Sequence, residues 1–276
     1  MPTTQNISLA DTHAHLDMRR FDADRDEVIA RAQAAGLNAI ITVGIDPVSS
    51  RRAVELSHRH QVVWAAVGIH PQDSKQAPLT DINVITELAQ NEKVIAIGEI
   101  GLDYYRDYAP REQQIKVFRQ QLELAGDLRK PVIIHCRQAE NAVLAMLQEW
   151  VERGGLPSSC GVGVIHCFNG TFETAQAYLN MGFYLGLGAY IGYPSSQTMH
   201  ETIRQLPLDR LLIETDCPFL PPQSKRGERN EPAYVAETAK KLAEIKGISL
   251  ETIAAQVYAN TTKLFNLPRR QTPVTS

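Results

Sequence analysis

The first residues whose types could do chemistry lie in the segment ISLADTHAHLD, residues 7–17. A short apolar run leads into Asp11, His13 and His15, each two positions from the next. Successive side chains of a β-strand alternate between its faces, so these three share one face if the strand continues through Ala14. Two interpretations are open at this point. The three are either polar side chains at the exposed end of a strand or half of a metal site, since imidazole is the commonest side-chain metal ligand.

Similar side chains follow other short apolar runs of the sequence. They are His70, Glu99, His135 and His166 after the third to sixth runs, and Glu214 and Asp216 after the eighth. If the runs are parallel strands of one barrel, their carboxyl ends lie at one rim, where the active sites of such barrels are found. Burying several ionisable groups together is costly unless they pair or bind a cation. Because no basic residues lie near these acids, metal ions explain the set better than salt bridges do.

One hypothesis divides the set by strand order into two metal sites that share a carboxylate. The members are His13, His15 and Asp216 for the first site, His135 and His166 for the second, and Glu99 as the bridge. Two cations about 3.5–4 Å apart are the arrangement used for in-line displacement at phosphorus.

The elements that must position these residues can be read from hydrophobic periodicity. Eight short, β-rich runs alternate with longer amphipathic segments. The runs are residues 7–10, 39–43, 62–67, 94–98, 131–135, 162–166, 183–188 and 211–215. Most are apolar enough to be strands buried on both faces, as in parallel sheets. Residues 24–36, 110–126 and 250–265 have helical patterns with suitable end residues.

This alternation at this chain length predicts one α/β domain, a (β/α)8 barrel of the TIM type, over residues 1–268. An open, doubly wound sheet is the rival fold, and no G-x-G-x-x-G follows the first run to support its dinucleotide-binding form. Residues 269–276 are predicted to be a disordered tail.

Composition indicates a globular protein without a membrane span. The chain has 276 residues, 43% hydrophobic and 21% charged, with a formal net charge of −3. A polyanionic partner would therefore need a local basic patch or bound cations. Four cysteines lie far apart, and the N-terminus lacks the features of a signal peptide, so we expect a monomer in the cytoplasm.

The ordered motifs resemble those of one known family. DTHAHLD, GIHP, GEIGLDYY, PVIIHCR, VIHCF and ETDCPFL, followed by KRGERNEPAYV, are similar to the TatD family of metal-dependent deoxyribonucleases within the amidohydrolase-like barrels. The resemblance runs from Asp11 to the C-terminal helix ending in NTTKLF. It implies a barrel with two divalent cations, Mg, Mn or Zn, and DNA or another phosphodiester as substrate.

The resemblance also implies roles for single residues. The family's metal ligands correspond to His13, His15, Glu99, His135, His166 and Asp216. Many relatives bridge the metals with a carboxylated lysine on the fourth strand, whereas this chain has Glu99 at that strand end. Cysteines follow three of the ligands, and we expect these thiols to point away from the barrel interior, although zinc capture by a thiol is conceivable.

The implied reaction is phosphodiester hydrolysis by a water that the cations activate. Asp216 and Glu99 then act at the metals, Asp216 also as acceptor of the water's proton, while His70 binds a non-bridging phosphate oxygen. Asp11 and Glu214 are expected to orient ligand histidines. For Glu214, a structural ion pair with Arg210 or Lys225 is an equal alternative.

Substrate contacts are expected from the loop after the eighth run. Its cations include Arg226 and Arg229, which would supply the local basic patch. Aromatic residues after strand ends are candidates for stacking on bases: Tyr104, Tyr105, Phe168, Tyr190 and Phe219.

Three functional classes are open on the sequence. A deoxyribonuclease is favoured. A hydrolase of another ester or amide, for example a D-aminoacyl-tRNA deacylase, could use the same metals on carbon. A non-catalytic metal-binding scaffold is least expected, because every ligand of the motif is present.

Overall fold

The computed structural model describes residues 7–76, 79–106, 108–155 and 161–268. In this part of the chain, eight parallel strands form one sheet in which each strand pairs with the next in sequence. They are β1 (Leu9–Ala14), β2 (Leu37–Val43), β3 (Val63–Val67), β4 (Val94–Asp103), β5 (Val132–Arg137), β6 (Gly163–Ile165), β7 (Tyr184–Leu187) and β8 (Leu211–Ile213). The (β/α)8 prediction is confirmed. The predicted tail, residues 269–276, lies outside the described residues.

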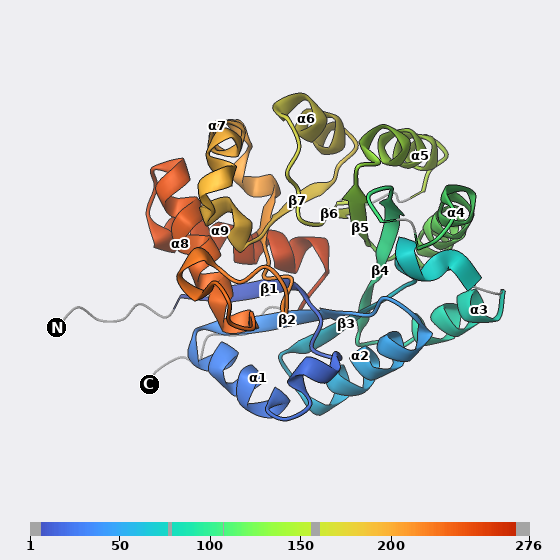
Figure 1. Ribbon diagram of the computed structural model, residues 1–276, viewed down its shortest axis with the longest axis horizontal. Coiled ribbons are helices and arrows are strands. Elements are labelled where there is room, and N and C mark those ends of the chain that lie inside the picture. The colour runs from blue at the N-terminus through green and yellow to red at the C-terminus, as the bar shows by residue number, and fades with distance from the viewer. Residues whose placement is uncertain (1–6, 77–78, 107, 156–160, 269–276) are drawn as a thin grey trace.

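The helices surround the sheet (Figure 1). Among the described residues they are α1 (Arg25–Ala34), α2 (Pro47–Arg59), α3 (Leu79–Leu88), α4 (Arg111–Leu128), α5 (Glu140–Glu152), α6 (Phe172–Asn180), α7 (Gln197–Gln205), α8 (Val235–Lys246) and α9 (Leu250–Leu264). The segments predicted from periodicity match α1, α4 and α9 to within a few residues. Local chemistry fixes several helix starts: before α2, for example, the Asp46 carboxylate accepts a hydrogen bond from the Ser49 N–H at 2.7 Å.

The sheet closes where β8 meets β1. The Thr12 hydroxyl donates to the Ile213 carbonyl at 3.1 Å. Further along, the Asp216 N–H donates to the His13 carbonyl at 2.9 Å, and the His15 N–H donates to Cys217 at 2.8 Å. These bonds place the polar end of β1 beside the polar segment after β8, more than 200 residues later in the sequence.

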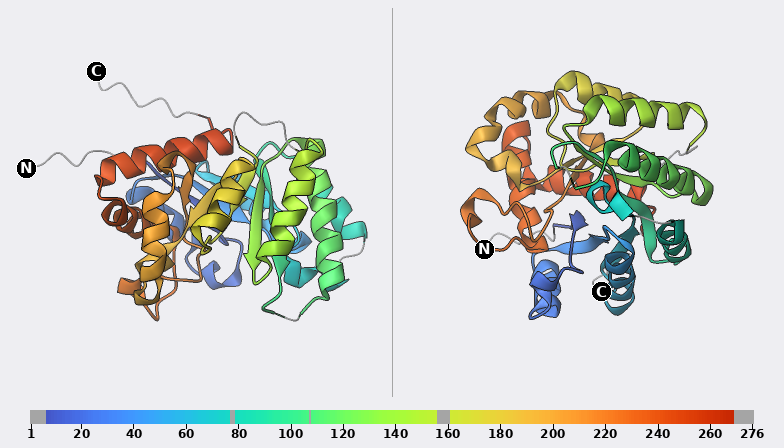
Figure 2. Two further views of the ribbon diagram at one scale, coloured as in Figure 1. Left: turned by 90° about the horizontal axis from the view of Figure 1, so that it is seen from above. Right: turned by 45° about the vertical axis from the view of Figure 1, so that its right-hand side comes forward.

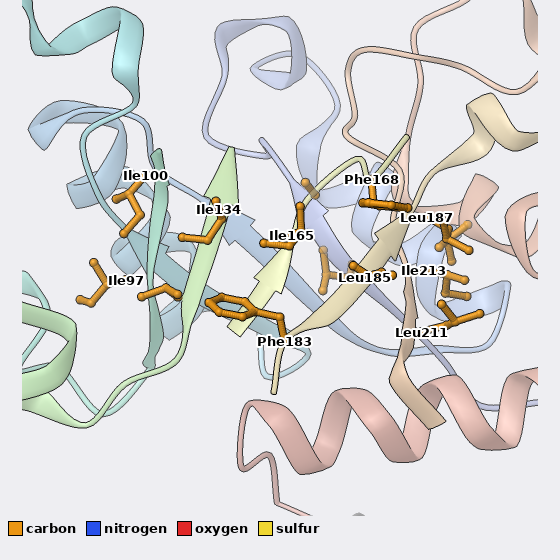
Figure 3. Close-up of a cluster of buried hydrophobic side chains, with 14 of the residues drawn as sticks. Ile97, Ile100, Ile134, Ile165, Phe168, Phe183, Leu185, Leu187, Leu211 and Ile213 are labelled. Carbon is orange, nitrogen blue, oxygen red and sulfur yellow. The ribbon is translucent and has the colours of Figure 1, made fainter. Parts of the chain in front are cut away.

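The hydrophobic side chains form two layers. One cluster takes alternate residues such as Ala39, Ile41 and Ile133 and fills the barrel interior below the site. The other takes the intervening residues, which face the helices. Figure 3 shows part of this outer cluster along β4 to β8. Burial on both faces explains why the strands read as continuous apolar runs.

Helix α9 covers the end of the barrel at which the strands begin (Figure 2, left). Its last residues, Leu264 and Phe265, pack against the interior cluster. Asn260, 3% exposed, ties the helix to the sheet, because its amide donates to the Leu208 and Leu211 carbonyls at 2.9 and 2.8 Å.

Replacing Asn260 by Ala should therefore destabilise the fold by about 1–3 kcal/mol, because two carbonyls lose their donor in a buried setting. Urea unfolding followed by far-UV circular dichroism measures this loss. Lys263→Ala, at an exposed position of the same helix, is the control and should change the unfolding free energy little. Equal unfolding midpoints for Asn260→Ala and the parent protein would contradict the role of the amide.

Candidate metal centre

A β-bulge in β1 turns His13 into the site. Asp11 pairs with Ile40 and Ala14 with Thr42, so β1 has one residue more than β2 between these pairs. As a result Leu9 and Ala14, an odd and an even position, both belong to the outer cluster. Bulges re-aim side chains in this way, often beside active sites.

The bulge also corrects the prediction that Asp11 shares a face with His13 and His15. The Asp11 carboxylate accepts the Thr215 hydroxyl at 2.6 Å, the Thr215 N–H at 2.9 Å and the His13 N–H at 3.2 Å. It thus lies in the seam between β1 and β8 and positions His13 through the backbone. Burial raises its pKa to about 8.

A second bulge, in β4, aims Glu99. Ile97 and Ile100 pair with Val132 and Ile134, so β4 again has one extra residue. Both isoleucines face the helices, and Glu99 between them turns inward. Beyond the bulge β4 continues to Asp103, five residues past the predicted end, because Gly101 allows β5 to approach closely. A Cβ at Gly101, whose φ is 144°, would lie 1.9 Å from the His135 carbonyl oxygen.

Four donor atoms converge at the centre of the barrel mouth. His13 Nε2 lies 3.3 Å from His15 Nε2 and 3.4 Å from Glu99 Oε2. His15 Nε2 lies 3.4 Å from Asp216 Oδ1 and 3.8 Å from Glu99 Oε2. Ligands about 2.1 Å from a tetrahedral cation are separated by about 3.4 Å. Three of these side chains, His13, His15 and Asp216, form a set of possible ligands whose donor atoms all lie within 4.8 Å of one another, and Glu99 lies beside the two histidines.

The other oxygen of Glu99 faces a second group of histidines. Glu99 Oε1 lies 2.7 Å from His135 Nδ1 and 3.8 Å from His70 Nε2. The opposite nitrogen of His135 lies 3.3 Å from Asp103 Oδ2. His70, Glu99 and His135 form a set of possible ligands whose donor atoms lie within 4.8 Å of one another.

His166 stands on the other side of the first group. Its ring stacks on His13 with centroids 3.5 Å apart, and its Nε2 lies 3.8 Å from Asp216 Oδ1. Its Nδ1 lies 3.0 Å from the buried Glu214 carboxylate. The structure thus brings the six expected ligands together, but it groups His166 with Asp216 rather than with His135. Their roles as ligands stay predictions.

Glu214 contacts His166, and it forms no ion pair with Arg210 or Lys225, the two partners proposed from the sequence. It also accepts the Cys167 N–H at 2.6 Å. Arg210 lies over the Tyr184 ring, and Lys225 pairs with Glu228 at 3.5 Å. This geometry supports an orienting role for Glu214 over a structural ion pair.

The charges of the centre are set by burial and by one another. Burial disfavours charge on Glu99, but His13 and the hydrogen bond with His135 outweigh it and hold the pKa of Glu99 well below its usual range. Burial likewise opposes charge on His15, yet Asp216 and Glu99 raise its pKa to about 9. Without a cation the centre keeps ionised carboxylates by holding protons on histidines. A divalent cation would displace those protons, so its affinity should depend on pH.

His70 is held in one neutral form. Burial and the neighbouring His135 lower its pKa to about 3. Its Nδ1 accepts the Gln72 N–H at 3.2 Å, which leaves the proton on Nε2, the nitrogen that faces Glu99. A protonated Nε2 is a hydrogen-bond donor and not a metal ligand.

Helix α4 fixes two strand ends of the site with paired glutamines. The Gln121 amide bonds both the N–H and the carbonyl of Ile69, at 2.7 and 3.0 Å. The Gln114 amide does the same for Asp103, at 2.9 and 3.0 Å. Each amide replaces the ladder partners that a neighbouring strand would supply.

The centre opens into a cavity of about 750 Å³. Its lining includes His135, His166 and Asp216 at the centre, Arg106 and Arg137 on one side, and Tyr193, Phe219 and Leu220 among the others. Cys167 lies close to this centre, in a set of possible ligands with His166 and Asp216. The expectation that all three thiols point away is wrong for Cys167. Cys167 lies past the end of β6 and has a left-handed backbone with a φ of 47°, so the alternation of side chains along a strand does not apply to it.

The two arginines predicted to contact substrate differ in their surroundings. Arg229 is engaged elsewhere, because its guanidinium pairs with both Asp24 oxygens at 2.7 and 2.8 Å. Arg226 lies 4.7 Å from the ring of Tyr193, which lines the cavity. The role predicted for Arg229 therefore loses its basis, whereas that of Arg226 stays a prediction.

Sequence reasoning did not single out Asp103, Arg106 or Arg137. Asp103 lies in GEIGLDYY and Arg137 in PVIIHCR, two of the motifs that carried the resemblance. The spacing of Arg137 two positions after His135, which continues the alternation of β5, was the available signal.

The fold and the centre together define a metal-dependent hydrolase of the (β/α)8 type. The family model described as TatD related DNase matches residues 10–266, so the chain belongs to this family. It is 42% identical over 260 residues to an uncharacterized metal-dependent hydrolase, YabD, of Bacillus subtilis, covering 94% of this chain and 99% of that protein.

Two further similarities agree with this assignment. The chain is 34% identical over 262 residues to the Escherichia coli 3'-5' ssDNA/RNA exonuclease TatD, covering 93% of this chain and 98% of that one. The crystal structure of YjjV, a TatD homologue from E. coli, superposes with a TM-score of 0.88 at 30% identity, covering 96% of this chain and all of that one. The predicted family and enzyme class are confirmed. No helix in the described ranges is long and apolar enough to cross a membrane.

Replacing Glu99 by Gln should lower the affinity for divalent cations by at least about 10–100-fold, the loss typical of removing even an outer partner of a metal site. The change keeps the volume and removes the charge that both histidine groups face. Equilibrium dialysis with metal analysis measures the effect, and circular dichroism checks the fold. Glu55→Gln, at an exposed position of α2, is the control. Parent-like metal content in Glu99→Gln would refute the bridging role.

Proposed function

We propose that this protein is a metal-dependent nuclease that hydrolyses phosphodiester bonds of single-stranded nucleic acid, DNA in the first place. The observation that carries the proposal is the position of Glu99. Its two oxygens face two separate groups of histidines, His13 with His15 and His135 with His70. A carboxylate shared by two cations suits in-line displacement at phosphorus. The name of the E. coli relative, a 3'-5' ssDNA/RNA exonuclease, supports this class of substrate.

The donor set indicates which cations the centre would hold. His13, His15, Glu99 and Asp216 would hold the first, and Glu99 with His135 the second, while His166, whose Nε2 lies 3.8 Å from Asp216 Oδ1, would join the first group. Imidazole nitrogens favour zinc over magnesium, whereas the carboxylates of the centre also suit magnesium and manganese. Bound there, divalent cations would polarise the phosphodiester and lower the pKa of the attacking water.

The remaining steps fall to the chain's own side chains. Asp216, 15% exposed at its side chain, reaches the cavity and can accept the proton of the attacking water. His70 presents a neutral Nε2–H from the adjacent strand end and can donate to a phosphate oxygen as it gains charge. Glu214 keeps His166 oriented, and Asp11 keeps the His13 backbone in place.

A hydrolase of another ester or amide, such as D-aminoacyl-tRNA, is the second candidate, because the same centre could act at carbon. A cytoplasmic, monomeric enzyme stays the prediction from the sequence.

The substrate class is tested with metal-free protein to which Mg, Mn or Zn is restored in turn. The assay compares labelled single-stranded DNA, duplex DNA, RNA, a small phosphodiester and a carboxylic ester. We expect cation-dependent shortening of single-stranded DNA at a rate well above that of the carboxylic ester. Glu99→Gln protein purified in parallel controls for contaminating nucleases. Ester cleavage without any cleavage of oligonucleotides would replace the proposal by the second candidate.

Replacing His70 by Ala separates its role from that of a ligand. Loss of one donor to the transition state typically costs about 10²–10³ in rate, so turnover should fall by that factor while metal content stays near that of the parent. Steady-state kinetics and metal analysis on the same sample measure both. His58→Ala, at an exposed histidine of α2, is the control. A collapse of metal content would instead make His70 a ligand.

A further inference from the structure

Two arginines reach the cavity without a carboxylate partner among the described residues. Arg137 is the last residue of β5, and Arg106 lies in the loop after β4. Both are exposed and both line the cavity that holds His135 and Asp216. Other arginines of the described chain, such as Arg31 and Arg229, form ion pairs with acids. Two guanidinium groups without an acidic partner in the described chain therefore lie at the mouth of the metal centre.

An aromatic ring holds Arg137 in place. Its guanidinium lies 3.9 Å from the centroid of the Tyr105 ring, and the Arg106 guanidinium lies 5.5 Å from the same ring. Tyr105 is itself fixed through its N–H, which donates to Asp103 Oδ1 at 2.9 Å. A stacked guanidinium loses little further freedom when it binds, and its planar edge suits a phosphate. Arg137 is thus pre-organised for an anion.

The cavity also has an apolar side. Phe219 and Leu220, 42% and 37% exposed, both line it. The Phe219 N–H donates to the Asp216 carbonyl at 2.8 Å, so this aromatic residue is fixed to the metal centre. Exposed large apolar side chains at a cavity mouth mark a binding surface. Cationic side chains and an aromatic face in one groove are the combination that binds single strands.

We propose that Arg137, braced by Tyr105 and assisted by Arg106, binds a phosphate of the strand next to the phosphodiester bond being cut, while Phe219 stacks on an unpaired base. The proposal rests on the nuclease function and names the subsite that holds the strand. It gives the acidic chain its local cationic patch after β4 and β5, whereas the sequence pointed to the loop after β8. Stacking on Phe219 requires an unpaired base, so single strands should bind better than duplexes.

Binding is tested with the full-length protein in excess chelator, which stops hydrolysis. Fluorescence anisotropy of a labelled single-stranded oligonucleotide gives the affinity at several salt concentrations. Arg137→Gln should weaken binding by about 10-fold, the loss expected for one charge-assisted hydrogen bond. It should also reduce the slope of affinity against salt by about 0.7, one phosphate contact on a single strand. Lys116→Gln, which removes an exposed charge from α4, should change neither value.

The brace is tested at Tyr105. Tyr105→Phe keeps the ring and should bind like the parent protein, whereas Tyr105→Ala should lose part of the affinity. Combined with Arg137→Gln, Tyr105→Ala should add little, because the two residues act as one unit. Additive losses would overturn the brace.

The stacking partner is tested with an oligonucleotide that carries abasic positions. Phe219→Ala should weaken binding of the normal strand and leave binding of the abasic strand unchanged. Equal losses for both strands would overturn stacking on Phe219.

Comparing the binding and the cleavage experiments distinguishes a failure of this subsite from a failure of the nuclease function. If the parent protein cleaves single-stranded DNA and Arg137→Gln binds it equally well, the subsite is wrong and the function stands. If the parent protein neither binds nor cleaves the strand, both fail. Equal melting temperatures for the variants and the parent exclude misfolding as the cause of a loss.

Discussion

The carboxylate of Glu99 is buried among four histidines, and the centre depends on how its negative charge is compensated. Only 4% of the residue is exposed, so solvent cannot stabilise the charge. His13, His15, His70 and His135 come within 2.7–3.8 Å of its oxygens. A buried acid of this kind must hold either protons on its neighbours or a cation between them. The same constraint links the protonation of these histidines to the binding of a cation.

Backbone irregularity supplies the geometry that regular strands cannot. In an unbroken strand, alternation would send half of the polar side chains of β1 and β4 toward the helices. One extra residue in each of the two strands reverses the alternation where His13 and Glu99 must face inward, while the apolar residues on either side keep their outward positions. The cost of the two local disruptions is offset by the outer cluster, which stays continuous on both sides of each bulge.

The two bulges also limit how much of the site could be predicted from the sequence. All eight strands, the barrel and the convergence of the histidines and acids follow from apolar periodicity and from the rule that parallel strands end at one rim. The placement of Asp11 and Cys167 does not follow, because a bulge and a left-handed residue break alternation without a signal in residue type. Arg229 looked available for substrate because its partner, Asp24, lies 205 residues away. The cluster of Tyr105 with Arg137 was equally hidden, since only the pairing of β4 with β5 brings the two together.

Two glutamines of α4 hold two neighbouring loops at the mouth of the barrel. Gln114 and Gln121 are two helical turns apart, and each fixes both backbone groups of a residue beside the site, Asp103 and Ile69 respectively. The loops after β3 and β4 are therefore both held in position by α4, and their relative placement does not depend on contacts between the loops. Grafting either loop onto a related barrel would transfer the correct side chains but not their alignment, unless the matching glutamine of α4 is transferred as well. The unit of exchange in this part of the barrel is thus a loop together with a face of α4.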